Sequence, residues 1–212
     1  MNKETLLLYF IMGSQDTDKN PAEVLKQAVA GGITCFQFRE KGPASKTAEQ
    51  KEELARELLA VCRSRSIPFI VNDDVDLAVK IGADGVHIGQ GDEPASSVKK
   101  KLPAHMIIGV SAKTLKEAEK AVQDEADYIG TGPMYATTSK DDADAPIGPE
   151  GIQDLRKLGI TLPIVGIGGI TEENVKNVMQ AGADGVSLIS AISRSDDPEA
   201  STRRLWQLVK NK

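Results

Sequence analysis

Eight short runs rich in Val, Ile, Leu and aromatic residues recur along the chain, and their number constrains the fold more than any other feature. Several are apolar at consecutive positions, which is typical of parallel strands covered by helices. Eight such units in 212 residues predict an α/β protein, a closed (β/α)8 or TIM barrel whose single domain spans residues 1–212. The predicted strands are residues 6–12, 34–40, 68–73, 85–89, 106–111, 127–132, 163–169 and 185–190.

Charged, amphipathic stretches separate these runs and have the features of helices. One of them begins with Pro21, a residue favoured in the first helical turn, and ends in glycines. The longest combines an apolar stripe with many charged residues, which predicts a helix lying on the sheet. The clearest predicted helices are residues 21–32, 45–65, 114–125, 171–182 and 197–210.

An internal repeat supports the barrel. The segment "IGADGVHIG" at 81–89 is similar to "AGADGVSLIS" at 181–190, and "DEADYIGTG" and "VAGGITCFQF" are weaker copies. Gly82 and Gly182 lie 100 positions apart, which corresponds to four βα units of roughly 25 residues each. Asp84 and Asp184 fall where a helix gives way to a strand. That end of a barrel usually serves stability, so we predict structural roles for both.

Composition limits the partners of the protein. Acidic and basic residues are mixed along the chain with a net charge of −5, which argues against a nucleic-acid surface or an anionic membrane surface. No apolar run approaches the roughly 18 residues of a membrane span. The segment "LLLYFIM" favours a buried strand over a signal peptide. Cys35 and Cys62 are isolated and lack metal-binding spacing, which predicts a reducing, cytoplasmic location. The sequence does not specify an oligomeric state.

Polar side chains collect where the predicted strands end, which is the end of such a barrel that carries its chemistry. The stretch "CFQFREK" shows this best, because alternation puts Gln37, Arg39 and Lys41 on the face opposite Phe36 and Phe38. Other strand ends carry Asn72, Asp73, Asp74, His87, Gln90, Asp92, Ser111, Thr137, Thr138, Ser139, Lys140 and Ser190.

Three groups in this set have separable chemistry. Arg39, Lys41 and Lys140 bring three positive charges to one opening, which suits phosphate oxygens, although a solvated rim paired with acids is the alternative. Asp73 and Asp92 follow neighbouring strands and can converge on Mg²⁺, although acids after strands also serve as helix caps.

The third group is the backbone of "GIGGI" and "LISAIS", near the ends of the last two strands. Gly168 and Gly169 let an anion approach main-chain N–H groups, although glycines also serve plain turns. The barrel therefore has places for two anions. His87 lies within a strand and is interpreted as a core or supporting residue, and no Ser–His–Asp pattern is visible. Such a site suits the departure of diphosphate, because fixed cations offset the charge on the leaving group.

With these residues in view, the sequence resembles the thiamine phosphate synthase family along nearly its whole length. The motifs that carry the resemblance are "QFREK", "FIVNDDVDLA", "ADGVHIGQGD", "GVSA", "GTGPMYATTSK" and "PIVGIGGI". The family joins a hydroxymethylpyrimidine diphosphate to a thiazole phosphate and releases diphosphate, using Mg²⁺ on a (β/α)8 barrel. One departure is Ser139, where the family usually has threonine; the hydroxyl is kept.

The resemblance implies a role for each matching residue. Asp73 and Asp92 would bind Mg²⁺, and Arg39, Lys41, Ser111 and Lys140 would act in catalysis. The pyrimidine diphosphate would be held by Gln37, Arg39, Lys41, Asn72, Ser111 and Lys140, and the thiazole phosphate by Thr137, Ser139, Gly169, Ile189 and Ser190. The implied mechanism is dissociative: diphosphate leaves, and the thiazole nitrogen attacks the resulting methylene cation.

Three other functions stay open at this point. A thiazole tautomerase would share the barrel and the thiazole phosphate pocket, but it would not need the full set of cations and acids. Another phosphate-binding barrel, an isomerase or an aldolase, would need a placed carboxylate, histidine or Schiff-base lysine such as Lys41. A ligand sensor would bind the same molecules without turnover.

Overall fold

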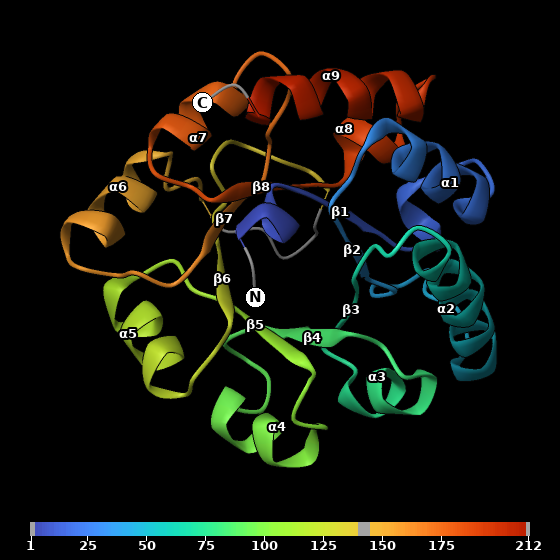
Figure 1. The fold of residues 1–212 in the computed structure, drawn as a ribbon, viewed down its shortest axis with the longest axis horizontal. Coiled ribbons are helices and arrows are strands. Elements are labelled where there is room, and N and C mark those ends of the chain that lie inside the picture. The colour runs from blue at the N-terminus through green and yellow to red at the C-terminus, as the bar shows by residue number, and fades with distance from the viewer. Residues whose placement is uncertain (1–2, 140–144, 211–212) are drawn as a thin grey trace.

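The computed structural model describes residues 3–139 and 145–210, and its eight strands form the predicted closed parallel barrel (Figure 1). Each strand pairs with the next along the chain, and β1 pairs with β8 to close the ring, with Tyr9 opposite Ser187. The strands are β1 (Leu8–Met12), β2 (Cys35–Phe38), β3 (Phe69–Asn72), β4 (Gly85–Ile88), β5 (Ile107–Ser111), β6 (Tyr128–Thr131), β7 (Ile164–Ile167) and β8 (Gly185–Leu188).

Helices surround the ring of strands (Figure 1). None of the described helices is both long enough and apolar enough to span a bilayer. The α-helices are α1 (Pro21–Gly31), α2 (Ala48–Arg63), α3 (Val75–Ile81), α4 (Ala95–Lys101), α5 (Leu115–Gln123), α6 (Glu150–Lys157), α7 (Val175–Gln180), α8 (Ser190–Ser193) and α9 (Pro198–Lys210), and the 3₁₀ helices are η1 (Lys3–Leu6) and η2 (Ser14–Asp16).

All eight strands are shorter than predicted, in part because apolar runs continue into turns. The run at 163–169 leaves the sheet after Ile167, where Gly168 and Gly169 take left-handed φ angles of +96° and +64°. The predicted helix at 171–182 is also shorter. Its first residues form a turn in which the Thr171 N–H donates to Asn174 Oδ1 (2.9 Å), and α7 begins at Val175.

Strand alternation divides the core into two layers. Phe36 and Phe38 point outward and pack with Phe10 and Phe69 between the strands and the helices, with ring centroids 5.5–6.3 Å apart. A smaller cluster inside the barrel contains Leu6, Tyr9, Ile11, Cys35, Ile70, Tyr128, Val165 and Ile189. The inner layer combines aliphatic side chains with two tyrosines, so polar groups lie within the barrel.

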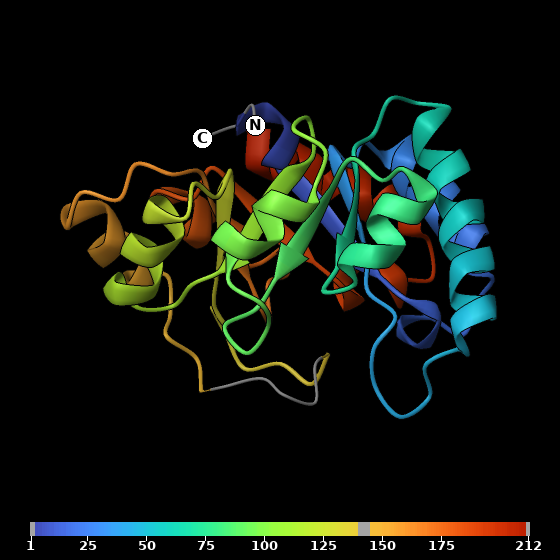
Figure 2. The same ribbon diagram turned by 90° about the horizontal axis from the view of Figure 1, so that it is seen from below.

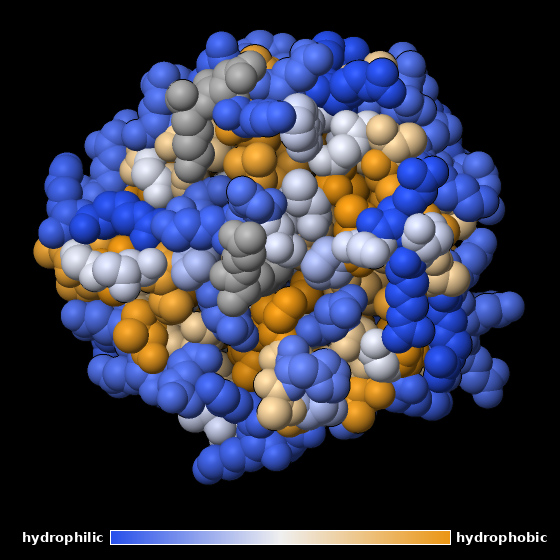
Figure 3. All heavy atoms as spheres, in the orientation of Figure 1, coloured by the Kyte–Doolittle hydropathy of each residue, from blue (hydrophilic) through white to orange (hydrophobic). Residues whose placement is uncertain are grey.

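The two ends of the barrel differ. η1 lies over the amino ends of the strands, at the centre of the view in Figure 1, and its Leu6 joins the inner core. Figure 3 shows this face with hydrophilic residues around the rim and hydrophobic residues nearer the middle. In Figure 2 the chain end labelled N lies on one side of the molecule, and the loops after β2 and β4 lie on the other.

The sequence repeat corresponds to a repeated contact at the amino ends of the strands. The residue just before each even-numbered strand accepts a hydrogen bond from the first part of the preceding odd-numbered strand. Asp84 Oδ2 accepts from Phe69 N (2.8 Å), Asp127 Oδ2 from Ile108 N (2.8 Å), and Asp184 Oδ2 from Ile164 N (3.0 Å). Thr34 Oγ1 accepts in the same way from Leu8 N (2.9 Å). Both weaker copies of the repeat are therefore structural equivalents of the stronger pair.

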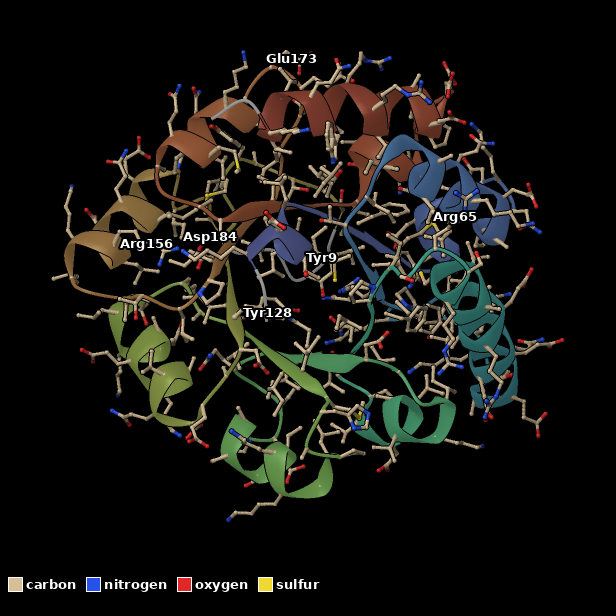
Figure 4. All side chains as sticks on the ribbon, viewed as in Figure 1. Tyr9, Arg65, Tyr128, Arg156, Glu173 and Asp184 are labelled. Carbon is tan, nitrogen blue, oxygen red and sulfur yellow. The ribbon has the colours of Figure 1, made fainter. Side chains whose placement is uncertain are left out.

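Asp184 has the most partners of these residues. Its carboxylate is 8% exposed and also pairs with Lys3 (2.7 Å) and Arg156 (2.5 Å), the second of which lies beside it in Figure 4. Burial alone would raise the pKa of this carboxyl. The hydrogen bonds from Lys3 and Ile164 N and the charge of Arg156 outweigh burial and lower the pKa below its ordinary value.

Asp184→Asn is expected to lower the free energy of unfolding at neutral pH by about 1–3 kcal/mol, because buried donors lose a charged acceptor. Since the folded state lowers the pKa, the carboxylate stabilises the protein above its unfolded pKa of about 3.9, and this contribution is lost as the pH falls through the folded pKa. Urea unfolding at pH 7 and pH 3 should show a gap between wild type and variant that shrinks in acid. Asp154→Asn, at an exposed i,i+3 pair with Lys157, is the control and should change stability little. A gap of equal size at both pH values would contradict this role.

Candidate functional site

Two adjoining pockets open at the carboxyl ends of the strands. One has a volume of about 490 Å³ and is lined mainly from β5 to β8, and the smaller has about 100 Å³ and is lined by residues from all eight strands and by residues that follow β2, β3 and β4. They share a wall made of Ser111, Gly130, Ile167 and Ser187. Molecules bound in the two pockets would therefore lie next to each other across this wall.

The end of β2 supplies cations to the smaller pocket. Gln37, Arg39 and Lys41 line it together, as their alternation predicted, and Arg39 is only 8% exposed. Glu40 points to the other side and accepts hydrogen bonds from Ser14 N (2.8 Å), Ser14 Oγ (2.7 Å) and Lys46 N (3.0 Å). The loop after β2 is thus tied down beside the guanidinium of Arg39, whose planar fork suits phosphate oxygens.

Asn72, Asp73 and Asp92 line the same pocket. Asp73 adopts a left-handed φ of +61°, and its carboxylate lies 2.8 Å from Lys41 Nζ. Asp92 Oδ2 accepts from Gly89 N (2.7 Å). Burial, and next the charge of Asp73, raise the pKa of Asp92. The two carboxylates therefore repel one another, and a divalent cation between them would relieve that repulsion.

Asp74 has a different environment, as alternation predicted. Its carboxylate caps α3 by accepting from Leu77 N (3.0 Å) and pairs with Lys51 (2.7 Å). Among the described residues, no group of three or more His, Cys, Asp or Glu side chains is arranged to hold a metal ion. Two carboxylates fit Mg²⁺ only if phosphate oxygens and waters complete its shell, which is the usual arrangement at phosphate sites.

The larger pocket is lined by the predicted thiazole phosphate residues Thr137, Ser139, Gly169, Ile189 and Ser190. Ser139 Oγ donates to Ser190 Oγ (3.1 Å), and Ser139 N donates to Thr137 Oγ1 (3.2 Å), so the segment after β6 contacts the start of α8. A Cβ atom at Gly169 would lie 2.6 Å from the carbonyl oxygen of Ala136. Only glycine allows this close passage of backbone.

The structure brings all the described candidate residues to these two pockets, with Ser111 on the shared wall. Lys140 lies outside the described residues. Both cysteines are free and buried, and burial raises the pKa of each thiol, so neither is a reactive thiolate.

Sequence reasoning missed two tyrosines beneath the site. Tyr9 and Tyr128 lie inside the barrel, and their hydroxyls are 2.8 Å apart. Each stands in a run that otherwise reads as an apolar strand. A tyrosine within an apolar strand could have indicated a polar contact inside the barrel, since a buried tyrosine O–H needs a partner. His87 is 9% exposed and contacts Tyr128, in agreement with its interpretation as a supporting residue.

These features define a (β/α)8 barrel with two adjoining pockets at the carboxyl ends of its strands. Residues 8–192 match the family model described as thiamine monophosphate synthase. The chain belongs to the thiamine monophosphate synthase family.

Relatives support the assignment over the full length. The chain is 53% identical over 208 residues to the thiamine-phosphate synthase of Geobacillus thermodenitrificans, covering 98% of this chain and 94% of that protein. It is 51% identical over 206 residues to the thiamine-phosphate synthase of Bacillus cereus strain AH187, covering 97% and 94%. The solved thiamine phosphate pyrophosphorylase of Pyrococcus furiosus superposes with a TM-score of 0.87 at 32% identity, covering 98% and 97% of the two chains. A structure titled native KDPGal is similar in fold alone, at 17% identity and a TM-score of 0.67 over 96% and 92%.

Gly169→Ala is expected to weaken binding of inorganic phosphate about tenfold, because a side chain at a left-handed residue adds roughly 1–3 kcal/mol of strain and would displace the backbone of this loop. The measurement is a phosphate titration followed by amide chemical shifts. Gly159→Ala is a matched control, since Gly159 also has a positive φ (+91°) but a Cβ there would meet no atom within 4 Å. Equal phosphate affinities in the two variants would show that Gly169 has no role in phosphate binding.

Proposed function

We propose that this protein is a thiamine-phosphate synthase. It transfers the hydroxymethylpyrimidine group from 4-amino-2-methyl-5-hydroxymethylpyrimidine diphosphate to 4-methyl-5-(2-phosphooxyethyl)thiazole, releasing diphosphate and forming thiamine phosphate. The observation that carries the proposal is the pair of pockets joined at Ser111, because this reaction needs two anionic heterocycles held side by side. The family match and the relatives named thiamine-phosphate synthase support it independently.

The smaller pocket takes the diphosphate. Arg39 binds its oxygens through the planar guanidinium fork and Lys41 adds a point charge, with Asn72 beside them. We assign Lys140 to the same diphosphate site only because the sequence resembles the family there. These groups offset the negative charge that builds on the departing diphosphate, so the C–O bond breaks before the new bond forms.

Asp73 and Asp92 would hold Mg²⁺, which supplies further positive charge to the diphosphate when bound. Lys41 then has two neighbours of opposite charge, its partner Asp73 and the leaving group. Removing either carboxylate would leave Lys41 and the metal ion with less compensating negative charge.

The larger pocket takes the thiazole phosphate. Thr137, Ser139 and Ser190 offer hydroxyls, and the Gly168–Gly169 turn offers close backbone approach to the phosphate. The thiazole nitrogen then faces the shared wall, where the methylene cation of the pyrimidine forms. The protein contributes orientation and charge neutralisation, and no nucleophilic side chain is required. The substrates are small molecules, and the two free buried cysteines suit a cytoplasmic location.

The three alternative functions, an aldolase or isomerase, a thiazole tautomerase and a ligand sensor, fit the cavity less well. A Schiff-base lysine is normally desolvated in an apolar pocket, whereas Lys41 is half-exposed and ion-paired with Asp73. A tautomerase would leave the cation-rich smaller pocket without a use. A sensor would bind both ligands and leave them unchanged.

Purified protein mixed with both phosphorylated heterocycles and Mg²⁺ is expected to form thiamine phosphate and diphosphate in equal amounts. Chromatography with a coupled diphosphate assay measures both products. Binding of both ligands without product would favour a sensor. Rearrangement of a thiazole precursor in the absence of the pyrimidine would favour a tautomerase.

Asp73→Asn is expected to raise the Mg²⁺ concentration for half-maximal rate at least tenfold, because one charged ligand becomes neutral. Asparagine tolerates the left-handed backbone at this position, so the change acts on charge more than on shape. Asp74→Asn removes the same charge one residue away and keeps a good helix cap. Its Mg²⁺ requirement should match that of the wild type. An unmoved titration curve in Asp73→Asn would show that this carboxylate is not a ligand.

A further inference from the structure

A continuous chain of hydrogen bonds crosses the inside of the barrel beneath the two pockets. Gln37 Nε2 donates to the Tyr9 hydroxyl (2.9 Å), which lies 2.8 Å from the Tyr128 hydroxyl. The Tyr128 hydroxyl lies 3.0 Å from His87 Nδ1, and His87 Nε2 lies 3.0 Å from Ser111 Oγ. The chain thus connects two residues that line the smaller pocket, and Ser111 also lines the larger one.

The members of the chain come from five strands and are held tightly. Tyr9 and Tyr128 are 1% and 0% exposed, and Gln37 is 2% exposed; Figure 4 labels both tyrosines within the ring of strands. Gly109 makes room for the Tyr128 ring, since a Cβ there would lie 2.1 Å from its Cζ atom. Backbone sterics therefore leave this ring little freedom to move.

Each hydroxyl in the chain has one proton to donate. Burial raises the pKa of Tyr9 and of Tyr128 well above the ordinary value, so both phenols stay protonated. The hydroxyl of Tyr9 accepts from Gln37, and either hydroxyl can be the donor between Tyr9 and Tyr128. If Tyr9 donates to Tyr128 and Tyr128 donates to His87 Nδ1, the imidazole proton lies on Nε2 and is directed to Ser111.

This order of donors sets the polarity of both ends. In this arrangement Ser111 Oγ accepts from His87 Nε2, and the Ser111 proton is left to point into the cavity. Gln37 gives an N–H to Tyr9, so its carbonyl oxygen is left as an acceptor. An aminopyrimidine needs this combination, because its amino group donates and its ring nitrogen accepts.

We propose that His87 is a positioning residue that acts through this buried chain: its Nε2–H tautomer holds Ser111 as a donor, and the same chain holds the Gln37 carbonyl as an acceptor, toward the aminopyrimidine ring. The inference rests on the proposed function and deepens it by assigning recognition of the pyrimidine ring to residues that do not touch its diphosphate. An acceptor on the amino group strengthens its electron release into the ring, which helps to expel diphosphate. Recognition of the ring is thereby coupled to turnover.

Tyr128 is the member of the chain that lines neither pocket, so Tyr128→Phe interrupts the chain without removing a group from the cavity. The variant is expected to lower kcat/KM for the pyrimidine diphosphate about tenfold, the usual size of one lost hydrogen bond to a substrate group. Its KM for the thiazole phosphate should stay within twofold. A variant that is only partly folded would instead show lower kcat/KM values for both substrates.

A double-mutant cycle with Ser111→Ala gives the decisive readout. If the chain acts through Ser111, Tyr128→Phe should lower kcat/KM less than twofold further once Ser111 is alanine, because linked residues are not additive. The same tenfold loss in both backgrounds would overturn the proposal. Failure of the wild type to make thiamine phosphate would instead contradict the proposed function.

A second pair of variants tests His87 directly and remains informative if Tyr128→Phe is unstable. His87→Gln can place an amide N–H near the position of Nε2 and should restore most of the activity that His87→Leu loses. Urea unfolding of both variants checks that they fold. Equal kcat/KM values for the two would show that the donor to Ser111 is irrelevant, and would also overturn the proposal.

Discussion

Closure of the barrel by pairing of β1 with β8 is the constraint on which the rest of the structure depends. Closure gives every strand two hydrogen-bonded neighbours. It also means that alternate side chains along each strand point into the barrel and out toward the helices. It also brings eight strand ends to one rim. Gln37 on β2 and Ser190 after β8 are 153 positions apart in the chain, yet they line adjoining pockets.

The two ends of the barrel divide stability and function between them. At the amino ends, Thr34, Asp84, Asp127 and Asp184 accept hydrogen bonds from neighbouring strands. At the carboxyl ends the backbone turns through left-handed angles at Asp73, Gly168 and Gly169, and burial together with the charge of Asp73 raises the pKa of Asp92. Such features cost free energy in the free protein, and the well-bonded amino ends offset that cost. They also shape the rim where we propose that a cation and phosphate bind.

The inside of the barrel has a second role beyond packing. Apolar side chains alone would fill it more simply, because each buried polar group needs a partner. Here Tyr9, Tyr128 and His87 satisfy one another, and glycines on β5 and β6 leave the space for their rings. The floor of the cavity is therefore a connected set of hydrogen-bonded polar groups. It can influence how Gln37 and Ser111 meet a ligand without contributing a charge.

Sequence reasoning reached the fold and the rim because both depend on local patterns. Eight apolar runs, their helical spacers and the alternation of Gln37, Arg39 and Lys41 all follow from the geometry of single strands and helices. The separate environment of Asp74 followed for the same reason. The ends of the strands were placed too late wherever an apolar run continued into a turn, because hydrophobicity does not report the φ angle at Gly168.

The sequence by itself determined the order of the elements, the side of the barrel that each polar residue occupies, and the family. Only the tertiary structure decided that Ser111 lies on a wall between two pockets, that Asp73 and Asp92 are close enough to repel, and that five polar side chains join in one chain. These relations link residues on different strands across a closed interior. The distance between two such side chains depends on barrel closure and on the space left by glycines, and no local pattern in the sequence records either.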